Sequence, residues 1–353
     1  MPLAFASAAD LLAHGYDTLI DVRSPSEFAE DRIPGAVSLP ALNDAERARV
    51  GMIYVQESSF LARKIGAALV ARNAAAHIEG PLADRGGGWR PLVYCWRGGQ
   101  RSDSFVTILS HIGWRAEQVE GGYRSWRRLV QRALYESALP HRVVLLDGLT
   151  GTGKTELLHR LDRLGAQVLD LEGLARHRGS LLGAMLGGQP GQKAFETALI
   201  ARLSAFDPTR PVLAEAESSK VGDLVLPPAL WSAMRTAPRI EVTASLHARA
   251  CYLAEAYADL IHEPERLEHL LRQFIPLRGR TTVDRWIALL RAGDVPSLAS
   301  SLMIDHYDPA YRRSRARHPA IPLHSVAAGA LTDTDLDQAA EQIATFAAQH
   351  LPR

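Results

Sequence analysis

The sequence predicts two α/β domains, each built on a parallel sheet, with a helical extension in the second domain. In both halves of the 353-residue chain, short apolar runs of strand length alternate with helical patterns. Such alternation is typical of parallel sheets covered by helices on both faces. Pro140 separates the two series, because proline cannot continue a helix. We therefore predict a first domain at 1–135, a linker at 136–141 and a second domain at 142–353.

Three apolar runs in the first domain have the length and composition of strands, and they cover 18–22, 36–39 and 92–95. Ser7 can cap a helix at 8–14, and apolar residues at helical spacing indicate a longer helix around 60–70. The glycine-rich stretch at 80–90 is typical of a surface loop.

The second domain has five such runs, which cover 142–147, 167–171, 211–216, 239–244 and 321–326. A helical pattern at 156–164 follows the first of them, and a last helix is predicted at 336–350. Between the fourth and fifth strands, residues 263–303 show only helical patterns. We expect them to form the helical extension.

Charge and cysteine content exclude several classes of protein. The chain carries 40 basic and 39 acidic side chains, which excludes coating of nucleic acid by bulk charge but allows local basic patches. The only cysteines are Cys95 and Cys251, which excludes a disulfide scaffold and a four-cysteine zinc site. No apolar run approaches the roughly 18 residues that span a bilayer, and the first residues lack the cationic start of a signal peptide. We expect a cytoplasmic protein with no membrane partner.

A cysteine loop follows the third predicted strand. Cys95 ends the apolar run and precedes two glycines, two arginines and a helical pattern at 102–113. Backbone N–H groups and a helix N-terminus at such a position stabilise a thiolate and lower the thiol pKa. A nucleophilic sulfur in an anion cradle suits attack on phosphorus, or transfer of sulfur or selenium as a persulfide or perselenide. The predicted anion loop comprises Trp96, Arg97, Gly98, Gly99, Gln100 and Arg101.

A phosphate-binding loop is predicted at 148–155, where the sequence fits G-x-x-x-x-G-K-[ST] between an apolar strand and a helical run. Glycines let successive backbone N–H groups point at phosphate oxygens, and the helix N-terminus adds partial positive charge. Lys154 supplies a cation, and the Thr155 hydroxyl is a candidate Mg²⁺ ligand. The loop accepts a di- or triphosphate without identifying its carrier. Its predicted binding residues are Gly148, Thr150, Gly151, Thr152, Gly153, Lys154 and Thr155.

A candidate second acidic element ends the predicted strand 211–216. Glu215 and Glu217 are two residues apart, so alternation along a strand predicts both carboxylates on one face. An acid at this position can order a metal ion or a water molecule beside the phosphate. Solvated carboxylates at a strand end are an equally good interpretation.

Motifs across both domains carry a family resemblance. Segments 21–28, 32–40 and 121–126, together with the cysteine loop, resemble the rhodanese superfamily. A rhodanese-like domain joined to a C-terminal P-loop domain resembles the tRNA 2-selenouridine synthases. Four further stretches fit that family, namely 62–73, 170–180, 215–222 and 306–309.

The resemblance implies a transferase that changes the wobble 2-thiouridine of certain tRNAs in two steps. Geranyl diphosphate first alkylates the sulfur, and selenium from selenophosphate then replaces the S-geranyl group. Cys95 matches the family's rhodanese cysteine, which selenation requires, and 148–155 matches its P-loop, which we assign to a diphosphate or phosphate of the substrates. The family implies no tightly bound cofactor, and an enzyme that makes selenophosphate is the expected supplier. The geranyl chain needs an apolar slot, for which Leu181, Leu182, Met185 and Leu186 are candidates, although core packing is the better interpretation.

Arginine clusters are the candidate tRNA contacts. Arginine beside aromatic side chains suits phosphate contacts and stacking on an unpaired base, although each cluster alone is more often a solvated face. The clusters comprise Arg124, Arg127, Arg128 and Arg132; Arg272, Arg278, Arg280 and Arg285; and Arg312, Arg313, Arg315 and Arg317 beside Tyr307 and Tyr311. The selected contacts are Arg124, Arg127, Arg128, Arg278, Arg280, Tyr307, Arg312 and Arg313.

Three other functions fit parts of the sequence. Cys95 and Arg101 have the spacing of cysteine phosphatases, some of which share the rhodanese fold, but Asp103 would lie inside the following helix and make a poor general acid. A small-molecule kinase with a rhodanese regulatory domain would use the P-loop for ATP. A non-catalytic RNA-binding module would need neither an intact Cys95 nor an intact Lys154.

Overall fold

The computed structural model describes residues 2–317 and 321–351 and divides into two compact units. The first unit comprises Met1–Ser137 and Gly191–Ala205, and the second comprises Ala138–Pro190 and Phe206–Arg353. All eight strands expected from the sequence are present, with ends shifted by at most three residues. Among the described residues, no helix is long and apolar enough to cross a membrane.

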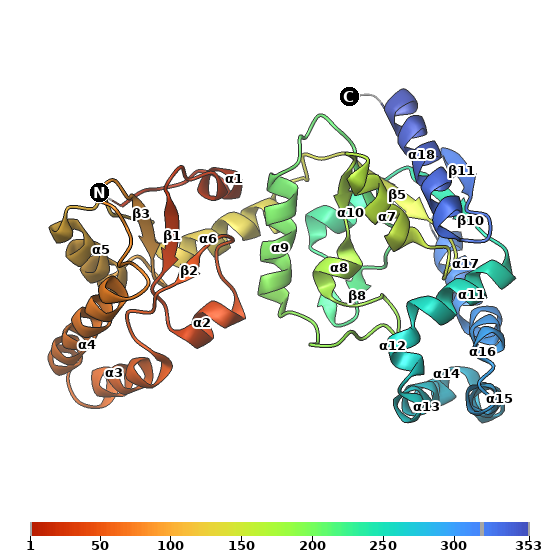
Figure 1. Ribbon diagram of the computed structural model, residues 1–353, viewed down its shortest axis with the longest axis horizontal. Helices are drawn as coiled ribbons and strands as arrows, with labels where there is room; N and C mark the ends of the chain where they lie inside the picture. Colours follow the sequence, from red (N-terminus) through yellow and green to blue (C-terminus); the bar gives the residue numbers. More distant parts are fainter. Residues whose placement is uncertain (1, 318–320, 352–353) are drawn as a thin grey trace. The chain divides into compact units, whose positions relative to one another are not determined.

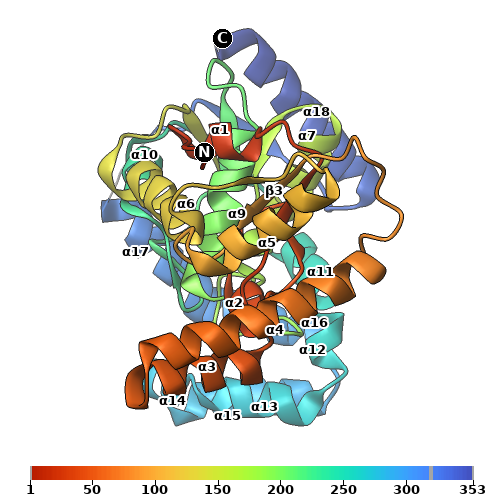
Figure 2. The ribbon, with the colours of Figure 1, turned by 90° about the vertical axis from the view of Figure 1, so that its left-hand side faces the viewer.

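The first unit is a four-stranded parallel sheet in the order β2-β1-β3-β4, with helices around it (Figure 1). Every residue of β3 is buried, as expected for a central parallel strand. Helices α3 and α4 run side by side (Figure 2). The elements are α1 (Ala8–Leu12), β1 (Thr18–Asp21), α2 (Pro25–Glu30), β2 (Val37–Ser38), α3 (Asp44–Gln56), α4 (Ser59–Glu79), β3 (Pro91–Tyr94), α5 (Gln100–Ile112), β4 (Glu117–Gln118), α6 (Gly122–Gln131), a π-helical turn (Arg132–Glu136) and α9 (Gln192–Ser204).

Helix α9 belongs to the first unit, although the sequence-based division left its residues in the second domain. The Thr197 hydroxyl donates to Asp31 Oδ2 (3.0 Å) and accepts from Trp126 Nε1 (3.2 Å). Glu196 pairs with Arg127 and accepts a hydrogen bond from the Tyr135 hydroxyl. Asp31 and Glu196 are both buried, and buried carboxylates need such partners. These polar contacts explain why the helix packs with the first unit.

The second unit contains a five-stranded parallel sheet in the order β11-β10-β5-β7-β6. Strand β5 lies in the middle of the sheet. After β5, the chain first forms β6 and β7 on one side of it and then β10 and β11 on the other side. Ligands of such open sheets bind at the carboxyl ends of the strands where the order reverses, which is the end of β5. The sheet elements are β5 (Val143–Asp147), α7 (Lys154–Arg163), β6 (Gln167–Leu169), α8 (Leu171–Ala175), β7 (Val212–Glu215), the antiparallel pair β8 (Lys220–Val221) and β9 (Leu224–Val225), α10 (Pro228–Thr236), β10 (Arg239–Thr243), β11 (His324–Ala327) and α18 (Asp333–His350).

The helical extension covers 246–317, which is longer than the predicted 263–303, and it has a core of its own. Phe274 and Trp286 are fully buried in it and meet edge to face, with ring centroids 5.7 Å apart. Leu182, from the loop that follows α8, joins the same core. The helices are α11 (Leu246–Ala256), α12 (Ala258–Ile261), α13 (Pro264–Arg272), α14 (Ile275–Arg278), α15 (Arg280–Arg291), α16 (Val295–Leu302), a π-helical turn (Met303–Tyr307) and α17 (Asp308–Arg317).

Candidate functional sites

The Cys95 sulfur lies at the carboxyl end of β3, where the loop turns into α5. The Ser102 hydroxyl donates a hydrogen bond to Cys95 Sγ (3.1 Å), and the Gly99 N–H points at the same atom (3.4 Å). The side-chain amide of Gln118 on β4 donates to the Ser102 hydroxyl (2.5 Å), which fixes its orientation. The sequence analysis missed Ser102, although its place in the first turn of the helix was a usable signal.

This environment favours the thiolate of Cys95. Burial by itself raises the pKa of the thiol, but the Ser102 hydroxyl, backbone amides of the loop and the Arg101 charge outweigh burial. The net pKa of Cys95 is therefore lower than that of an ordinary cysteine. A thiolate is the nucleophilic form of cysteine, so the geometry suits covalent or nucleophilic chemistry at this sulfur.

A second glycine motif fixes the shape of the cysteine loop. Gly122 has φ +58°, and a Cβ there would collide with the Cys95 carbonyl oxygen. Only glycine fits this approach, which lets the Tyr123 N–H donate to the Cys95 oxygen (2.8 Å) and the Arg124 N–H to the Trp96 oxygen (3.0 Å). The start of α6 thus holds the loop through its backbone.

A polar pocket of about 460 Å³ lies over this loop. Glu27 of α2 accepts from Arg101 Nη1 and pairs with Arg47 Nε, both at 3.0 Å. Burial raises the pKa of Glu27, but the Arg101 and Arg47 contacts outweigh burial and lower it, so the carboxylate stays ionised near neutral pH. Among the predicted loop residues only Gly98 is absent from the pocket wall; with φ +65°, it packs against the backbone of Gly121. The pocket is lined by Glu27, Glu30, Arg47, Cys95, Trp96, Arg97, Gly99, Gln100 and Arg101.

The predicted phosphate loop connects β5 to α7 at the reversal point of the second sheet. Gly151 and Gly153 have φ +83° and +73°, conformations that L-residues rarely adopt. Helix α7 begins at Lys154, so the N–H groups of its first turn have no intrahelical acceptor and remain for an anion. Lys154 Nζ lies over the loop and donates to the carbonyls of Gly148 (2.9 Å) and Leu149 (3.3 Å).

Buried ion pairs hold the phosphate loop in place. Asp147, fully buried at the end of β5, accepts from the Gly148 N–H (2.9 Å) and pairs with Arg239 and Arg315 (3.0 Å each). Arg249 of α11 forms a bidentate pair with Asp308 and donates to the Thr150 oxygen (3.0 Å). These contacts join residues far apart in the chain, and no local sequence signal predicted them.

Buried carboxylates also lie near the phosphate loop. Glu215 is almost fully buried, and its Oε1 accepts from the Glu172 N–H (2.7 Å). Burial and neighbouring carboxylates raise its pKa well above the usual range. Burial and the Glu172 charge raise the pKa of Glu217 to about 7 despite the opposing charge of Lys154. The expected strand alternation does not apply, because β7 ends at Glu215.

Comparisons with known proteins match both halves of the chain. Residues 5–129 match the model of the rhodanese-like domain, and residues 141–272 match that of the tRNA 2-selenouridine synthase AAA domain. The chain is 34% identical over 340 residues to tRNA 2-selenouridine synthase of Chromohalobacter salexigens, with 87% of this chain and 90% of that protein covered. The chain belongs to the tRNA 2-selenouridine synthase family. It is also 34% identical to the Verminephrobacter eiseniae member over 342 residues, which cover 85% of this chain and 90% of that protein. It is 35% identical to the Nitrosomonas europaea member over 273 residues, which cover 76% of this chain and 70% of that protein.

The fit of Mg²⁺ to this member of the tRNA 2-selenouridine synthase family can be tested on its side chains. Thr155, the predicted ligand, donates its hydroxyl to Glu172 Oε2 (3.0 Å). Over residues 2–317 and 321–351, no group of three or more His, Cys, Asp or Glu side chains is arranged to hold a metal ion. A Mg²⁺ at Thr155 would need water or substrate phosphate oxygens as its remaining ligands, which is usual for this ion.

Five of the predicted tRNA contacts in this synthase-family chain have exposed side chains, and they are Arg124, Arg128, Arg280, Arg312 and Arg313. Arg124 and Arg128 lie on α6 in the first unit, and the others lie on α15 and α17 in the second. The side chain of Arg317, a member of the same cluster, is outside the part that the structure describes.

Three predicted tRNA contacts are engaged within the protein instead. Arg127 is mostly buried and pairs with Glu196. Arg278 donates from Nε to His306 Nδ1 (2.8 Å), and Tyr307 faces an apolar pocket with its hydroxyl buried. The sequence signal was misleading for these residues because helical spacing does not distinguish a solvated arginine from one that pairs internally.

Proposed function

We propose that the chain converts wobble 2-thiouridine in tRNA to 2-selenouridine through an S-geranyl intermediate, with geranyl diphosphate and selenophosphate as substrates. Family membership supports the overall reaction. Two glycine loops support the two-step chemistry: one holds a cysteine whose thiol pKa is lowered, and the other holds the Lys154 side chain over its backbone carbonyls.

The phosphate loop is assigned to geranylation. The 2-thiouridine sulfur attacks C1 of the geranyl group, the bond from C1 to the diphosphate oxygen breaks, and the N3 proton of the base leaves. Negative charge develops on the departing diphosphate. Loop N–H groups and Lys154 stabilise that charge, so no ATP hydrolysis is needed.

The cysteine loop is assigned to selenation. Overall, hydrogen selenophosphate and water convert the S-geranyl base into the selenouridine, geranylthiol and hydrogen phosphate. The arginines of the polar pocket suit the tetrahedral anion, and the Cys95 thiolate is the nucleophile available there. The selenium donor implies a selenophosphate-forming enzyme as supplier, and tRNA as substrate implies action in the cytoplasm.

Nucleoside mass spectrometry of tRNA incubated with the full chain tests this proposal. Geranyl diphosphate alone should give S-geranyl-2-thiouridine, and addition of selenophosphate should give 2-selenouridine. Unmodified 2-thiouridine after both incubations would refute the assignment.

Two candidates for the general acid of a phosphatase, Glu27 and Asp103, are unsuited to that role. Glu27 is ionised, because Arg101 and Arg47 hold its pKa down, and an ionised carboxylate cannot donate a proton to a leaving group. Asp103 is exposed within α5, as the sequence predicted. Aryl phosphate hydrolysis and nucleotide-dependent phosphorylation assays separate the phosphatase and kinase alternatives from the proposed reaction.

A further inference from the structure

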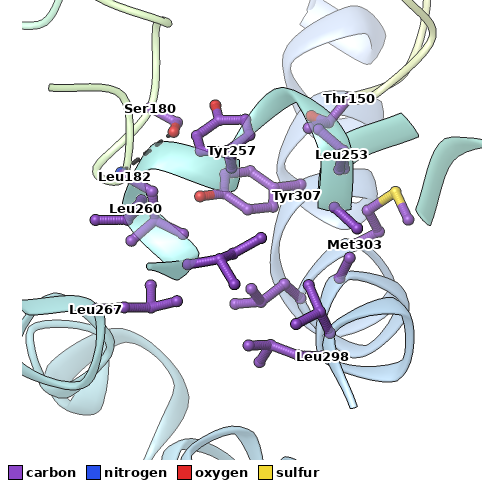
Figure 3. Close-up of a pocket in the computed structure, with 15 residues that line it drawn as sticks. Thr150, Ser180, Leu182, Leu253, Tyr257, Leu260, Leu267, Leu298, Met303 and Tyr307 are labelled. Carbon is purple, nitrogen blue, oxygen red and sulfur yellow. Dashed lines mark hydrogen bonds between the residues drawn. The ribbon is translucent and has the colours of Figure 1, made fainter. Parts of the chain in front are cut away.

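The apolar pocket near the phosphate loop is small. Its volume is about 70 Å³, and the side chains of Thr150 and Ser180 lie toward one end of it (Figure 3). Of the apolar slot predicted from the sequence, Leu182 lines this pocket. A space of this size does not take up part of a tRNA, so the tRNA of the proposed reaction needs a contact surface elsewhere.

Exposed apolar side chains gather around one turn of the first unit. They are Met52 (55% exposed), Tyr54 (60%), Val55 (82%) and Phe60 (70%), and we call these four residues the hairpin patch. The turn at 57–58 joins α3 to α4, two helices that lie side by side (Figure 2). A group of large apolar side chains that are left in solvent marks a surface for a partner.

The core of the first unit does not use the hairpin patch. Helix α3 is anchored by Ile53, which is buried, and by Val50, which packs against the core. Helix α4 is anchored by the buried side chains of Ala62 and Leu69. Substitutions in the patch should therefore leave the fold intact, since most surface substitutions change stability little.

Positive charge surrounds the hairpin patch. Residues 47–63 include three arginines, whereas Glu57 is the only acidic residue in this stretch. Arg49 and Arg63 have exposed side chains, and neither forms an ion pair with another residue in the described part of the chain. Aromatic rings among arginines suit single-stranded RNA, because the bases stack on the rings and the phosphates pair with the guanidinium groups.

Helix α3 connects the hairpin patch to the polar pocket over Cys95. Arg47 lines that pocket and pairs with Glu27 (3.0 Å). Tyr54 follows Arg47 by seven residues, so it lies on the same face of α3, roughly 10 Å further along the helix axis. Gly51 lies between them, and a Cβ at this glycine would meet no atom within 4 Å. An RNA strand with one nucleotide in the polar pocket can therefore pass over α3 to Tyr54.

We infer that the hairpin patch binds unpaired nucleotides beside the wobble position of the tRNA, with one base stacked on the ring of Tyr54. The inference rests on the proposed function, in which the wobble nucleotide enters the polar pocket for selenation. It adds a contact surface for the anticodon loop that the arginine clusters predicted from the sequence do not include.

Fluorescence anisotropy of the full chain with a labelled anticodon stem-loop RNA tests the inference. Tyr54→Ala should weaken binding at least about fivefold, because a stacked base is lost. Ile112→Ala removes an exposed apolar side chain of α5 in the same unit and should bind as the wild type does. Wild-type affinity in Tyr54→Ala would overturn the inference and leave the patch as a surface for a protein. If the wild-type chain does not bind this RNA at all, the proposed function itself fails.

Two further variants separate stacking from simple apolar contact. Tyr54→Phe keeps the ring and should keep the affinity within about twofold, whereas Tyr54→Leu keeps apolar volume without a ring and should bind as weakly as Tyr54→Ala. The base analogue 2-aminopurine, placed on either side of the wobble position in two separate RNAs, reports the stacking directly. In one of them its fluorescence should be quenched by the wild type and less by Tyr54→Leu. Equal quenching by the two proteins in both RNAs would refute the stacking of a base on Tyr54.

Discussion

The cysteine loop and the phosphate loop use the same backbone arrangement in different surroundings. Each follows a buried parallel strand, β3 or β5, and opens a helix, α5 or α7. Each contains glycine with positive φ. The cysteine loop borders a pocket of arginines and glutamates, whereas the phosphate loop borders buried carboxylates and an apolar pocket.

Under the proposed function, this difference means that the loop backbone binds an anion in both places and the pocket walls select which anion binds. A small polar anion suits the first pocket, and a diphosphate with an apolar tail is assigned to the second loop. The supports differ too, because backbone hydrogen bonds from α6 hold the cysteine loop and buried ion pairs such as Arg249–Asp308 hold the phosphate loop.

Removal of the Cys95 sulfur is the strongest test of the assignment of selenation to the cysteine loop and geranylation to the phosphate loop. In Cys95→Ser, we expect selenation to fall at least about a thousandfold, because serine is a far weaker nucleophile at neutral pH. Geranylation should continue at the wild-type rate. Nucleoside mass spectrometry measures both products. Undiminished selenation would show that the Cys95 sulfur is not needed for this step.

Removal of the ammonium group is the complementary test. Lys154→Ala should lower kcat/KM for geranyl diphosphate by about a hundredfold, because the departing diphosphate loses a charged donor. Lys64→Ala, which removes an exposed lysine of α4, is the control. Identical geranylation kinetics in the two variants would mean that the P-loop serves another ligand.

The hydrogen bond from Ser102 to Cys95 is expected to lower the pKa of the thiol. Ser102→Ala removes a donor that stabilises the thiolate, so the pKa of Cys95 should rise. Ultraviolet absorbance of the thiolate during a pH titration measures this in a Cys251→Ser background. Ser104→Ala on the same helix is the control and should leave the midpoint of the thiolate titration unchanged. An unchanged midpoint in Ser102→Ala would show that the Ser102 hydroxyl does not stabilise the thiolate.

Glu217 gives the phosphate loop a pH dependence of its own. Its pKa of about 7 means that the carboxylate ionises as the pH rises through neutrality and then repels a bound diphosphate. Wild-type affinity should fall about fivefold more than that of Glu217→Gln between roughly pH 6 and pH 8, without added divalent cation. Titration calorimetry compares the two, with Glu341→Gln on α18 as control. If the affinities of the wild type and Glu217→Gln changed equally with pH, Glu217 would have no effect on the bound diphosphate.

The smallest effect concerns tRNA. Arg128→Ala should weaken tRNA binding about two- to threefold and reduce its salt slope by about one, because one phosphate contact is lost. Arg127→Ala should instead lower Tm, since it leaves the buried Glu196 without its charged partner. Filter binding at several salt concentrations measures the tRNA contact, and thermal melting measures the internal ion pair. If Arg127→Ala weakened tRNA binding and Arg128→Ala lowered Tm, the two assignments would be wrong.

Local signals predicted most of the fold and both loops. The apolar runs of β3 and β5 and the glycines after them lie within a few residues of each other, so the sequence placed Cys95 correctly at the end of a strand and Lys154 correctly where the loop after β5 meets a helix. Partners from distant segments left no such signal. Glu27 beside Arg101 and Asp308 beside Arg249 come together only through the tertiary fold. The apolar pocket was missed for the same reason. The two-residue strands β4, β8 and β9 were also not predicted.

Helix α9 bears on how the protein is synthesised. The ribosome makes the β1–β4 sheet first, then a stretch of the second unit that includes the P-loop, and only afterwards the helix that the first unit needs. Until translation passes that helix, Arg127 lacks Glu196 and Trp126 lacks the Thr197 acceptor. The first unit can therefore gain these contacts only after residue 197 has been made, and a chain that stopped at residue 137 would contain Cys95 but lack α9.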